Sequence, residues 1–431
     1  MTTLVSIYTP THDLTYIKEA YESLKIQTYK KWEWVIQPNG PVNKNDFPAD
    51  MLADDRVKFC SRVLGCNIGA LKALAVEQCG GELLLELDHD DYLVPGALAR
   101  IVKQYEKAGK GKAFIYSDCV HFFPDHKSEV FPERSGWTHY NFHHNDRDDV
   151  VMNSFEATPR ALCEIYWSPN HVRVWSREAY NAAGGYDMGL KVGDDHDLMV
   201  RTYLAGVDFY YINEPLYFYR RYDGNSFVIH NQAVQQQQFA NRDKYIYKLW
   251  AEWCRREGLL MIDLGGAYNC PKEDGYFALD VQHLEGVDYV CDVTKGLPFD
   301  DEQLGLVRAV DFLEHIPIGK VVPLMNRLYR KLAPGGLLAT MTPSVRGPDG
   351  TVGCGAYQDP THVSFWSENN FWYFTRAEQA KFVPQIKCRF QATRLFTDWP
   401  SEWHRKNYVA YVHADLLKIG GSGRVPGGVA I

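Results

Sequence analysis

The stretch Gly80–Leu98, GGELLLELDHDDYLVPGAL, decides how the first half of this chain folds. Three consecutive leucines, residues 83–85, follow two glycines and form a short apolar run that is typical of a buried strand. The run ends in Asp88–Asp91, where three carboxylates and an imidazole resist burial. Parallel sheets bind ligands beyond the carboxyl ends of their strands, so we expect this polar segment to lie at a binding edge.

Strand-like and helix-like segments alternate on both sides of this stretch. Residues 3–9, 32–40, 82–88 and 112–118 have strand character, and residues 15–29, 67–79 and 95–107 have helical spacing. This order predicts an α/β fold with a mainly parallel sheet covered on both faces. Residues 121–153 break the pattern with a polar segment rich in His and Asp, which we predict to be a long functional loop.

Two acidic clusters suggest chemistry in this half of the chain. Asp88 and Asp90 form an Asp-x-Asp pair, and oxygen ligands of this kind suit Mg²⁺ or Mn²⁺ shared with substrate phosphates. The second cluster, Asp194–Asp197, precedes a helix and could supply a general base facing a metal-bound diphosphate. The alternative for the first cluster is a solvated acidic turn in which Asp91 begins the next helix.

The first 230 residues resemble a family 2 glycosyltransferase with the GT-A fold. The matching segments, in order, are VSIYTPTHD, SLKIQTYKKWEWVIQPNG, NIGALKALA, LELDHDDYLVPGAL, IYSD, GGYD, GDDHDLMVR and EPLYFYRRYDGNS. The resemblance implies an inverting, metal-dependent transfer of a sugar from a nucleoside-diphosphate sugar, with uridine as the expected base, to an acceptor hydroxyl.

The resemblance also assigns roles to individual residues. It implies that Asp195 is the general base with Asp194 beside it, and that Asp88 and Asp90 hold Mn²⁺ or Mg²⁺. The residues expected around the nucleotide sugar are Thr9, Pro10, Asp13, Asn39, Lys72, Asp88 and His89.

Two positions depart from the family pattern. Asn39 stands where many relatives have an aspartate that contacts the base. The identity of the base is therefore left open. Tyr222 stands where relatives often have a metal-binding histidine, and His171 or His230 could supply that ligand instead.

A second α/β domain follows a polar helical connector. We assign residues 231–258 to the connector, residues 259–419 to the second domain and the Gly-rich residues 420–431 to a flexible tail. Within the second domain, Gly265 and Gly266 end a strand and Asp280 ends the next strand. A glycine turn followed by an acidic residue is how nucleotide-binding α/β folds approach a cofactor and hold its ribose.

This second domain resembles class I S-adenosylmethionine (SAM)-dependent methyltransferases of Rossmann-like fold. The matching segments are IDLGG, GYFALD, GVDYVCDVTKGLPFDDEQ, LEHI, LYRKLAPGGLLATMTPS and DPTHVSFWSENNFWYF. The resemblance implies that SAM would contact Asp263, Gly265, Gly266, Asp280, Asp292 and Asp311. It also places Glu314 and His315 at the end of the fourth strand, and His362 near an acceptor.

The short distance between two of these residues suggests a degenerate cofactor site. Asp280 lies only 17 positions after Asp263, and Pro271 and Gly275 lie between them, which leaves little room for a full helix. The helix N-terminus that would face the cofactor's carboxylate is therefore expected to be short or absent. Two readings follow: a domain that methylates the glycan, or one that only binds an acceptor or partner.

Composition narrows the remaining function classes. The net charge of -8 argues against a protein that mainly coats nucleic acid or anionic membrane. The ten cysteines form no CxxC pair, and the chain shows no signal peptide and no membrane-length apolar run, so we expect a cytoplasmic protein. Alternatives to the main reading are a bacteriophage-type enzyme that glycosylates hydroxymethylated DNA and a bifunctional glycosyl- and methyltransferase of surface polysaccharide synthesis.

Overall fold

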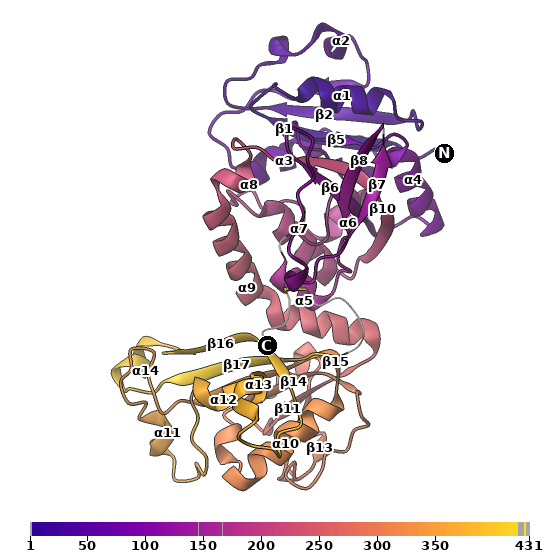
Figure 1. The fold of residues 1–431 in the computed structure, drawn as a ribbon. Coiled ribbons are helices and arrows are strands. Elements are labelled where there is room, and N and C mark those ends of the chain that lie inside the picture. Colours follow the sequence, from indigo (N-terminus) through magenta and orange to yellow (C-terminus); the bar gives the residue numbers. More distant parts are fainter. Residues whose placement is uncertain (1, 145, 166, 421–425, 428–431) are drawn as a thin grey trace. The chain divides into compact units, whose positions relative to one another are not determined.

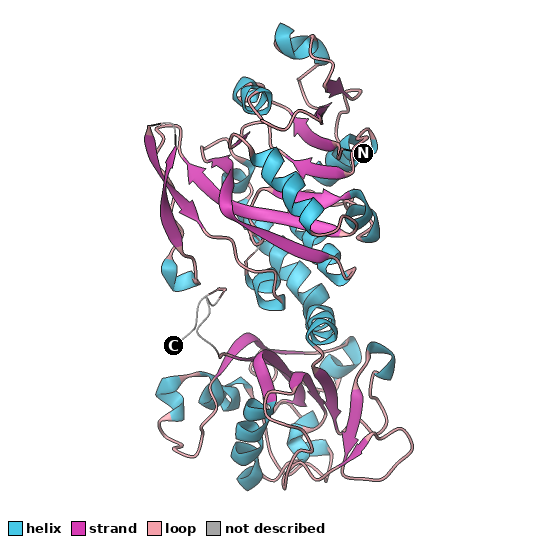
Figure 2. Cartoon of the chain, turned by 90° about the vertical axis from the view of Figure 1, so that its right-hand side faces the viewer, coloured by secondary structure: helices cyan, strands magenta, loops and turns pink. Residues whose placement is uncertain are grey.

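The computed structural model describes residues 2–144, 146–165, 167–420 and 426–427. The chain divides into two compact units, which are described separately below (Figure 1). Unit 1 comprises residues 1–249 with 424–428, and unit 2 comprises residues 250–423 with 429–431. In both units the strands are flanked by helices (Figure 2), as the alternating sequence pattern predicts.

Unit 1 is built on a ten-stranded sheet with the order β3-β2-β1-β4-β9-β6-β10-β5, to which the β7–β8 hairpin is added through β6. The strands are β1 (Val5–Thr11), β2 (Trp32–Pro38), β3 (Val57–Phe59), β4 (Leu83–Glu86), β5 (Tyr92–Leu93), β6 (Ala113–Phe122), β7 (His139–His144), β8 (Arg147–Met152), β9 (Arg173–Ser176) and β10 (Asp208–Arg220). Strands β1 to β4 are parallel, whereas β9 is antiparallel to both β4 and β6. The sheet is therefore mixed, with its parallel half at the N-terminal strands.

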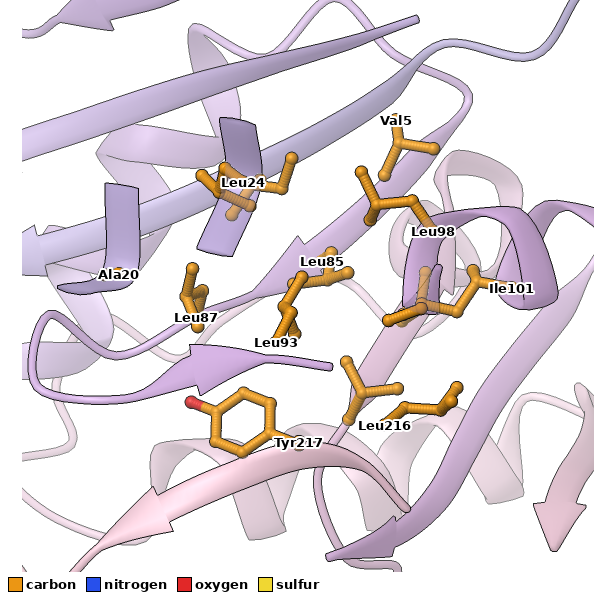
Figure 3. Packing of buried hydrophobic residues seen from close by; sticks show 14 of the residues in the cluster. Val5, Ala20, Leu24, Leu85, Leu87, Leu93, Leu98, Ile101, Leu216 and Tyr217 are labelled. Carbon is orange, nitrogen blue, oxygen red and sulfur yellow. The ribbon is translucent and has the colours of Figure 1, made fainter. Parts of the chain in front are cut away.

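The helices of unit 1 cover both faces of this sheet. They are α1 (Ile17–Lys25), α2 (Ala49–Leu52), α3 (Ile68–Glu77), α4 (Ala97–Lys107), α5 (Pro159–Glu164), α6 (Arg177–Ala182), α7 (Asp194–Leu204) and α8 (Ser226–Ile229), with short 3₁₀ turns at Lys44–Asp46 and Glu133–Ser135. Because side chains alternate across a strand, Leu85 packs with α1 and α4 (Figure 3), while Leu84 packs on the opposite face with residues of α3 and α7. The leucine run is thus buried on both sides, as a parallel strand requires.

The predicted loop over residues 121–153 is only partly a loop. Strand β6 continues to Phe122, and β7 and β8 form an antiparallel hairpin whose second strand pairs with β6. In β7, HYNFHH, exposed and half-buried side chains alternate with a period of two. In this alternation the half-buried Tyr140 and Phe142 are separated by exposed polar residues, which is a strand signal, but it is short and lies within a long polar segment.

The long helix α9 (Asn231–Glu257) forms where the sequence predicts a helical connector, and its residues from Trp250 onward belong to unit 2. The sheet of unit 2 has seven strands in the order β13-β12-β11-β14-β15-β17-β16, and β17 is antiparallel to both of its neighbours. The strands are β11 (Leu260–Leu264), β12 (Phe277–Asp280), β13 (Tyr289–Val290), β14 (Leu304–Val310), β15 (Leu332–Pro343), β16 (Phe390–Asp398) and β17 (Tyr411–Lys418). The helices are α10 (Ile318–Lys331), α11 (Gly355–Gln358), α12 (Glu368–Thr375), α13 (Ala377–Ala380) and α14 (Glu402–Lys406), with 3₁₀ turns η3 (Lys272–Asp274) and η4 (Leu313–His315).

The connection between β11 and β12 contains the 3₁₀ turn η3 and no α-helix. This agrees with the short spacing from Asp263 to Asp280. The predicted flexible tail, residues 420–431, lies mostly outside the described residues. Within the described part of that tail, Pro426 is buried, and its carbonyl accepts a hydrogen bond from Arg160 Nε at 2.8 Å.

Candidate functional site

A cavity of about 330 Å³ in unit 1 collects residues from both acidic clusters. The predicted site residues that line it are Pro10, Asn39, Lys72, Asp88, His89, Asp90, Asp194 and Asp195, and His171, Tyr222 and His230 line it as well. The cavity lies beyond the carboxyl ends of β1, β2 and β4, where parallel strands offer their ligand sites. Residues more than 100 positions apart in the sequence therefore share one pocket.

The three aspartates of the first cluster have different surroundings. Asp91 is 1% exposed, and its carboxylate accepts hydrogen bonds from the Arg220 backbone N–H at 2.6 Å and the Tyr217 hydroxyl at 2.9 Å. Asp91 thus holds the end of β10 to the turn after β4 and does not begin a helix, since α4 starts at Ala97.

Asp88 and Asp90 are left to face the cavity. Each of Asp88, Asp90 and Asp91 offers a carboxylate oxygen, and these oxygens lie within 4.8 Å of one another. Burial raises the pKa of Asp88 to about 8, with further contributions from the nearby carboxylates of Glu86 and Asp90. Lys72 opposes this rise in pKa only in part, and a divalent cation would offset the remaining repulsion, because carboxylate oxygens are the ligands that Mg²⁺ and Mn²⁺ prefer.

Lys72 lines the cavity as the counter-ion of two carboxylates. Its ammonium lies 2.5 Å from Glu86 Oε1 and 2.9 Å from Asp194 Oδ2, with 7% of its side chain exposed. Burial alone would lower the pKa of Lys72, but Asp194 and Glu86 raise it well above its usual value. Lys72 therefore joins α3 to β4 and α7, and its charge is largely used within the protein.

Asp194 and Asp195 begin α7, where the helix dipole favours negative charge. Asp195 keeps 23% of its side chain exposed, whereas Asp194 keeps 5%. Burial raises the pKa of Asp194 to about 6, against the opposing effect of Lys72. Asp195 is thus the more accessible of the two carboxylates to an acceptor.

A buried arginine controls the charge of Asp195. Arg173 on β9 is fully buried, donates from Nε to the Pro169 carbonyl at 3.0 Å, and donates from Nη1 to Asp195. Burial alone would raise the pKa of Asp195, but Arg173 outweighs it and holds that pKa well below its usual range. Asp195 is therefore ionised and oriented before any substrate binds.

Comparison with known proteins identifies the domain that holds this pocket. Residues 6–162 match the family described as Glycosyl transferase family 2. Over this range, about a third of the chain, the sequence is similar to family 2 glycosyltransferases. The matched range contains Lys72, Asp88 and Asp90 and ends before α7.

One relative and several solved structures are similar to part of the chain. Chondroitin synthase of Escherichia coli is 24% identical over 217 residues, which make up 50% of this chain and 28% of that protein. The chain thus spans under a third of that relative's length. Among solved structures, S. aureus TarS residues 1–349 superimposes with a TM-score of 0.40 and 15% identity, covering 59% of this chain and 72% of that one. Its complex with UDP-GlcNAc gives 0.40 and 13%, with coverage of 59% and 73%.

Two of the predicted nucleotide contacts in the glycosyltransferase domain do not line the cavity. Thr9 is fully buried, and its hydroxyl bridges the Leu87 carbonyl at 2.6 Å and Trp34 Nε1 at 2.8 Å. Asp13 accepts hydrogen bonds from the backbone and hydroxyl of Thr15. Thr9 thus ties β1 to β2 and to the segment after β4, and Asp13 stabilises the turn after β1.

Sequence reasoning missed Glu86 and Arg173. Glu86 is 1% exposed at the end of β4, and Arg173 lies opposite it on β9. Glu86, His171 and Asp195 also place one ligand atom each within 4.8 Å of one another, so His171 adjoins the acidic cluster. A charged residue inside an otherwise apolar strand, as in LLLE and VRVW, was the available signal.

In unit 2, the predicted SAM residues lie along the ends of the strands. Asp263 is buried and pairs with Arg308 at 2.7 Å, and the backbone turns at Gly265 with φ +72°. Gly266 follows it. Asp280 and Asp292 accept hydrogen bonds from backbone N–H groups two residues further on, and Asp311 follows β14.

The fit of unit 2 to SAM is incomplete. Strand order reverses between β11 and β14, which is where open α/β sheets form a ligand crevice. The connection from β11 to β12, however, contains no α-helix whose N-terminal N–H groups could face a carboxylate.

Over the part of the chain that the structure describes, no helix is long and apolar enough to cross a membrane.

Proposed function

We propose that unit 1 transfers a sugar from a nucleoside-diphosphate sugar to an acceptor hydroxyl, with inversion at the anomeric carbon. The observation that carries this proposal is a single pocket lined by Asp88 and Asp90, which lie in the range that matches Glycosyl transferase family 2, and by Asp195. One pair of carboxylates suits a diphosphate-bound cation, and the other carboxylate suits a proton acceptor.

The donor would lie along the strand ends. Pro10, Asn39 and His89 border the cavity beside the first cluster and are the candidate contacts to the nucleoside. Asp88 and Asp90 would hold Mn²⁺ or Mg²⁺, which would supply positive charge to stabilise the departing diphosphate. We take uridine diphosphate as the first donor nucleotide to test, because the resemblance of the sequence favours it.

The acceptor would be activated by Asp195. Its carboxylate takes the proton of the acceptor hydroxyl while that oxygen forms a bond to the anomeric carbon and the bond to the diphosphate oxygen breaks. Attack from the face opposite the leaving group inverts the configuration. Arg173 keeps Asp195 ionised and points it into the cavity, and Lys72 holds Asp194 in place behind it.

A thermal-shift panel tests the donor site first. The chain is heated with UDP, GDP, CDP or dTDP, each with Mn²⁺ or with EDTA, because a ligand that binds the native state raises the melting temperature. We expect one nucleotide to give a shift that needs Mn²⁺ and is lost in Asp90→Asn. The absence of a Mn²⁺-dependent shift with every nucleotide would refute the donor proposal.

For the acceptor, we propose a glycan hydroxyl. A relative named for the synthesis of chondroitin favours a glycan over hydroxymethylated DNA. We propose that unit 2 binds the acceptor or a partner, and we derive no methyl transfer from it because the cofactor-facing helix is absent. Adding SAM and S-adenosylhomocysteine to the same panel tests this: a shift with either would favour a bifunctional enzyme.

A further inference from the structure

Unit 2 contains a second group of metal-ligating side chains, separate from the glycosyltransferase pocket. Glu314, His315 and His362 each place one ligand atom within 4.8 Å of the others. Glu314 and His315 belong to η4, directly after β14, and His362 lies in the segment between α11 and α12. Residues nearly 50 positions apart thus meet at one edge of the sheet.

The carboxylate of Glu314 has an unused ligand atom. The residue is 1% exposed, and its Oε2 accepts a hydrogen bond from the Thr342 hydroxyl at 3.2 Å. Its Oε1 is buried and has no hydrogen-bond partner among the described residues. A buried carboxylate oxygen without a donor is costly unless something positive reaches it.

In both imidazoles Nδ1 is engaged in a hydrogen bond, which leaves Nε2 available to bind a metal ion. His362 Nδ1 lies 3.0 Å from the Ala356 carbonyl, which can only accept, so Nδ1 carries the proton and Nε2 keeps its lone pair. His315 Nδ1 lies 3.2 Å from the Thr361 hydroxyl, whose own proton goes to Asp359 at 2.6 Å. His315 is therefore also the donor at Nδ1. Metal-bound histidines are typically fixed in this way, by a hydrogen bond from the nitrogen that does not bind the metal.

The backbone holds the two segments together. The N–H groups of Val363 and Ser364 both donate to the Glu314 carbonyl, at 2.8 and 3.0 Å. The Ser364 hydroxyl donates to the Leu313 carbonyl at 2.8 Å. The segment that carries His362 is thus fastened to η4, so the three ligands are positioned by rigid contacts.

We propose that Glu314, His315 and His362 bind a divalent transition-metal ion of the zinc type. Two imidazoles and one carboxylate are a common ligand set for Zn²⁺, whose ligands lie at about 2.0–2.2 Å. Three protein ligands leave a coordination position open to solvent, as in sites where zinc binds water or a substrate oxygen.

Co²⁺ serves as the spectroscopic probe of this site. The full chain is freed of metal with EDTA and titrated with Co²⁺, and the visible absorption of low-coordinate Co²⁺ is recorded. We expect one equivalent to produce this absorption and Zn²⁺ to remove it by displacement. The ligand atoms of Asp88 and Asp90 are carboxylate oxygens, and Asp90→Asn, which removes one of them, should leave the signal unchanged and so separates the two sites.

Matched variants decide whether these residues are the ligands. Loss of groups that merely orient a metal ligand costs about 10–100-fold in affinity, so His362→Ala and Glu314→Gln should each weaken Co²⁺ binding by at least that much. His283→Ala removes an exposed histidine of unit 2 outside the cluster and should have no effect. Circular dichroism checks folding, and Glu314→Gln, which keeps an oxygen for Thr342, carries the test if His362→Ala does not fold. Unchanged Co²⁺ affinity in the folded variants, or no low-coordinate signal in the wild type, would overturn the proposal.

Discussion

The assignment of different roles to Asp90 and Asp91 can be tested by replacing each with alanine. Asp91→Ala removes the acceptor for two buried donors, the Arg220 N–H and the Tyr217 hydroxyl. Each buried donor left without a partner costs about 1–3 kcal/mol. Asp90 instead faces the cavity, so its removal should change the free energy of unfolding by less than about 1 kcal/mol.

Two features of the site reduce the cost of Asp91→Ala below the sum of both bonds. The Tyr217 hydroxyl still accepts the Asp88 N–H at 3.1 Å, so it keeps one partner. Burial, together with Asp90 and Asp88, raises the pKa of Asp91 well above its usual value, so the substitution also removes a costly buried charge. We therefore expect a net loss of about 2–4 kcal/mol, which is roughly a 9 °C fall in the melting temperature of a unit of this size.

The assay combines thermal unfolding with the Mn²⁺-dependent nucleotide shift. Asp91→Ala should melt well below the wild type and still show the shift at lower temperature. Asp90→Ala should melt near the wild type and lose the shift. The reverse pattern, with Asp91→Ala stable but unresponsive to Mn²⁺, would show that Asp91 is a metal ligand and that the structural argument is wrong.

Three further predictions concern Asp195, Asp194 and a glycine of unit 2. Asp195→Asn should keep Mn²⁺-dependent nucleotide binding but reduce sugar transfer about 10²–10⁴-fold, measured as nucleoside diphosphate released with acceptor present; full activity would exclude Asp195 as the base. Because burial raises the pKa of Asp194 to about 6, above its unfolded value, its contribution favours folding below that pKa and is lost as the pH rises from about 4 to 7. Wild-type stability should therefore fall by up to about 3 kcal/mol relative to Asp194→Asn over that range, and parallel pH profiles in urea unfolding would contradict this. In unit 2, Gly266→Ala would place a Cβ 2.9 Å from Asp263 Oδ2 and should cost about 1–3 kcal/mol, whereas Gly296→Ala meets no atom within 4 Å and should be neutral in the same unfolding assay.

Several features of the fold could be predicted from local sequence. The apolar run at residues 83–85, the helix over 231–257 and the missing helix before Asp280 all follow from side-chain periodicity or from chain length. The hairpin β7–β8 differs from the loop expected there, although the half-buried Tyr140 and Phe142 alternate with exposed polar residues along β7. Its pairing with β6 depends on a neighbour that local sequence does not reveal.

The candidate site divides in the same way. Two acidic clusters could be predicted as site residues from the sequence: Asp88 with Asp90, and Asp194 with Asp195. Both clusters line the same cavity. Thr9 and Asp13, predicted to contact the nucleotide, do not line the cavity, and their side chains are hydrogen-bonded to other groups of the protein. The residues that flank Thr9 and Asp13 in the sequence do not distinguish a nucleotide contact from a hydrogen bond within the protein.

The sequence by itself determined where charged residues follow buried strands. A short apolar run followed by carboxylates is a local pattern, and it indicates a buried strand that ends at a polar edge of the sheet. Only the tertiary structure decided which charges neutralise which. Arg173 reaches Asp195, and Lys72 joins Glu86 to Asp194. Such pairings arise because burial in a low-dielectric interior forces each charge to find a partner, and that partner is set by sheet topology, which brings distant residues together.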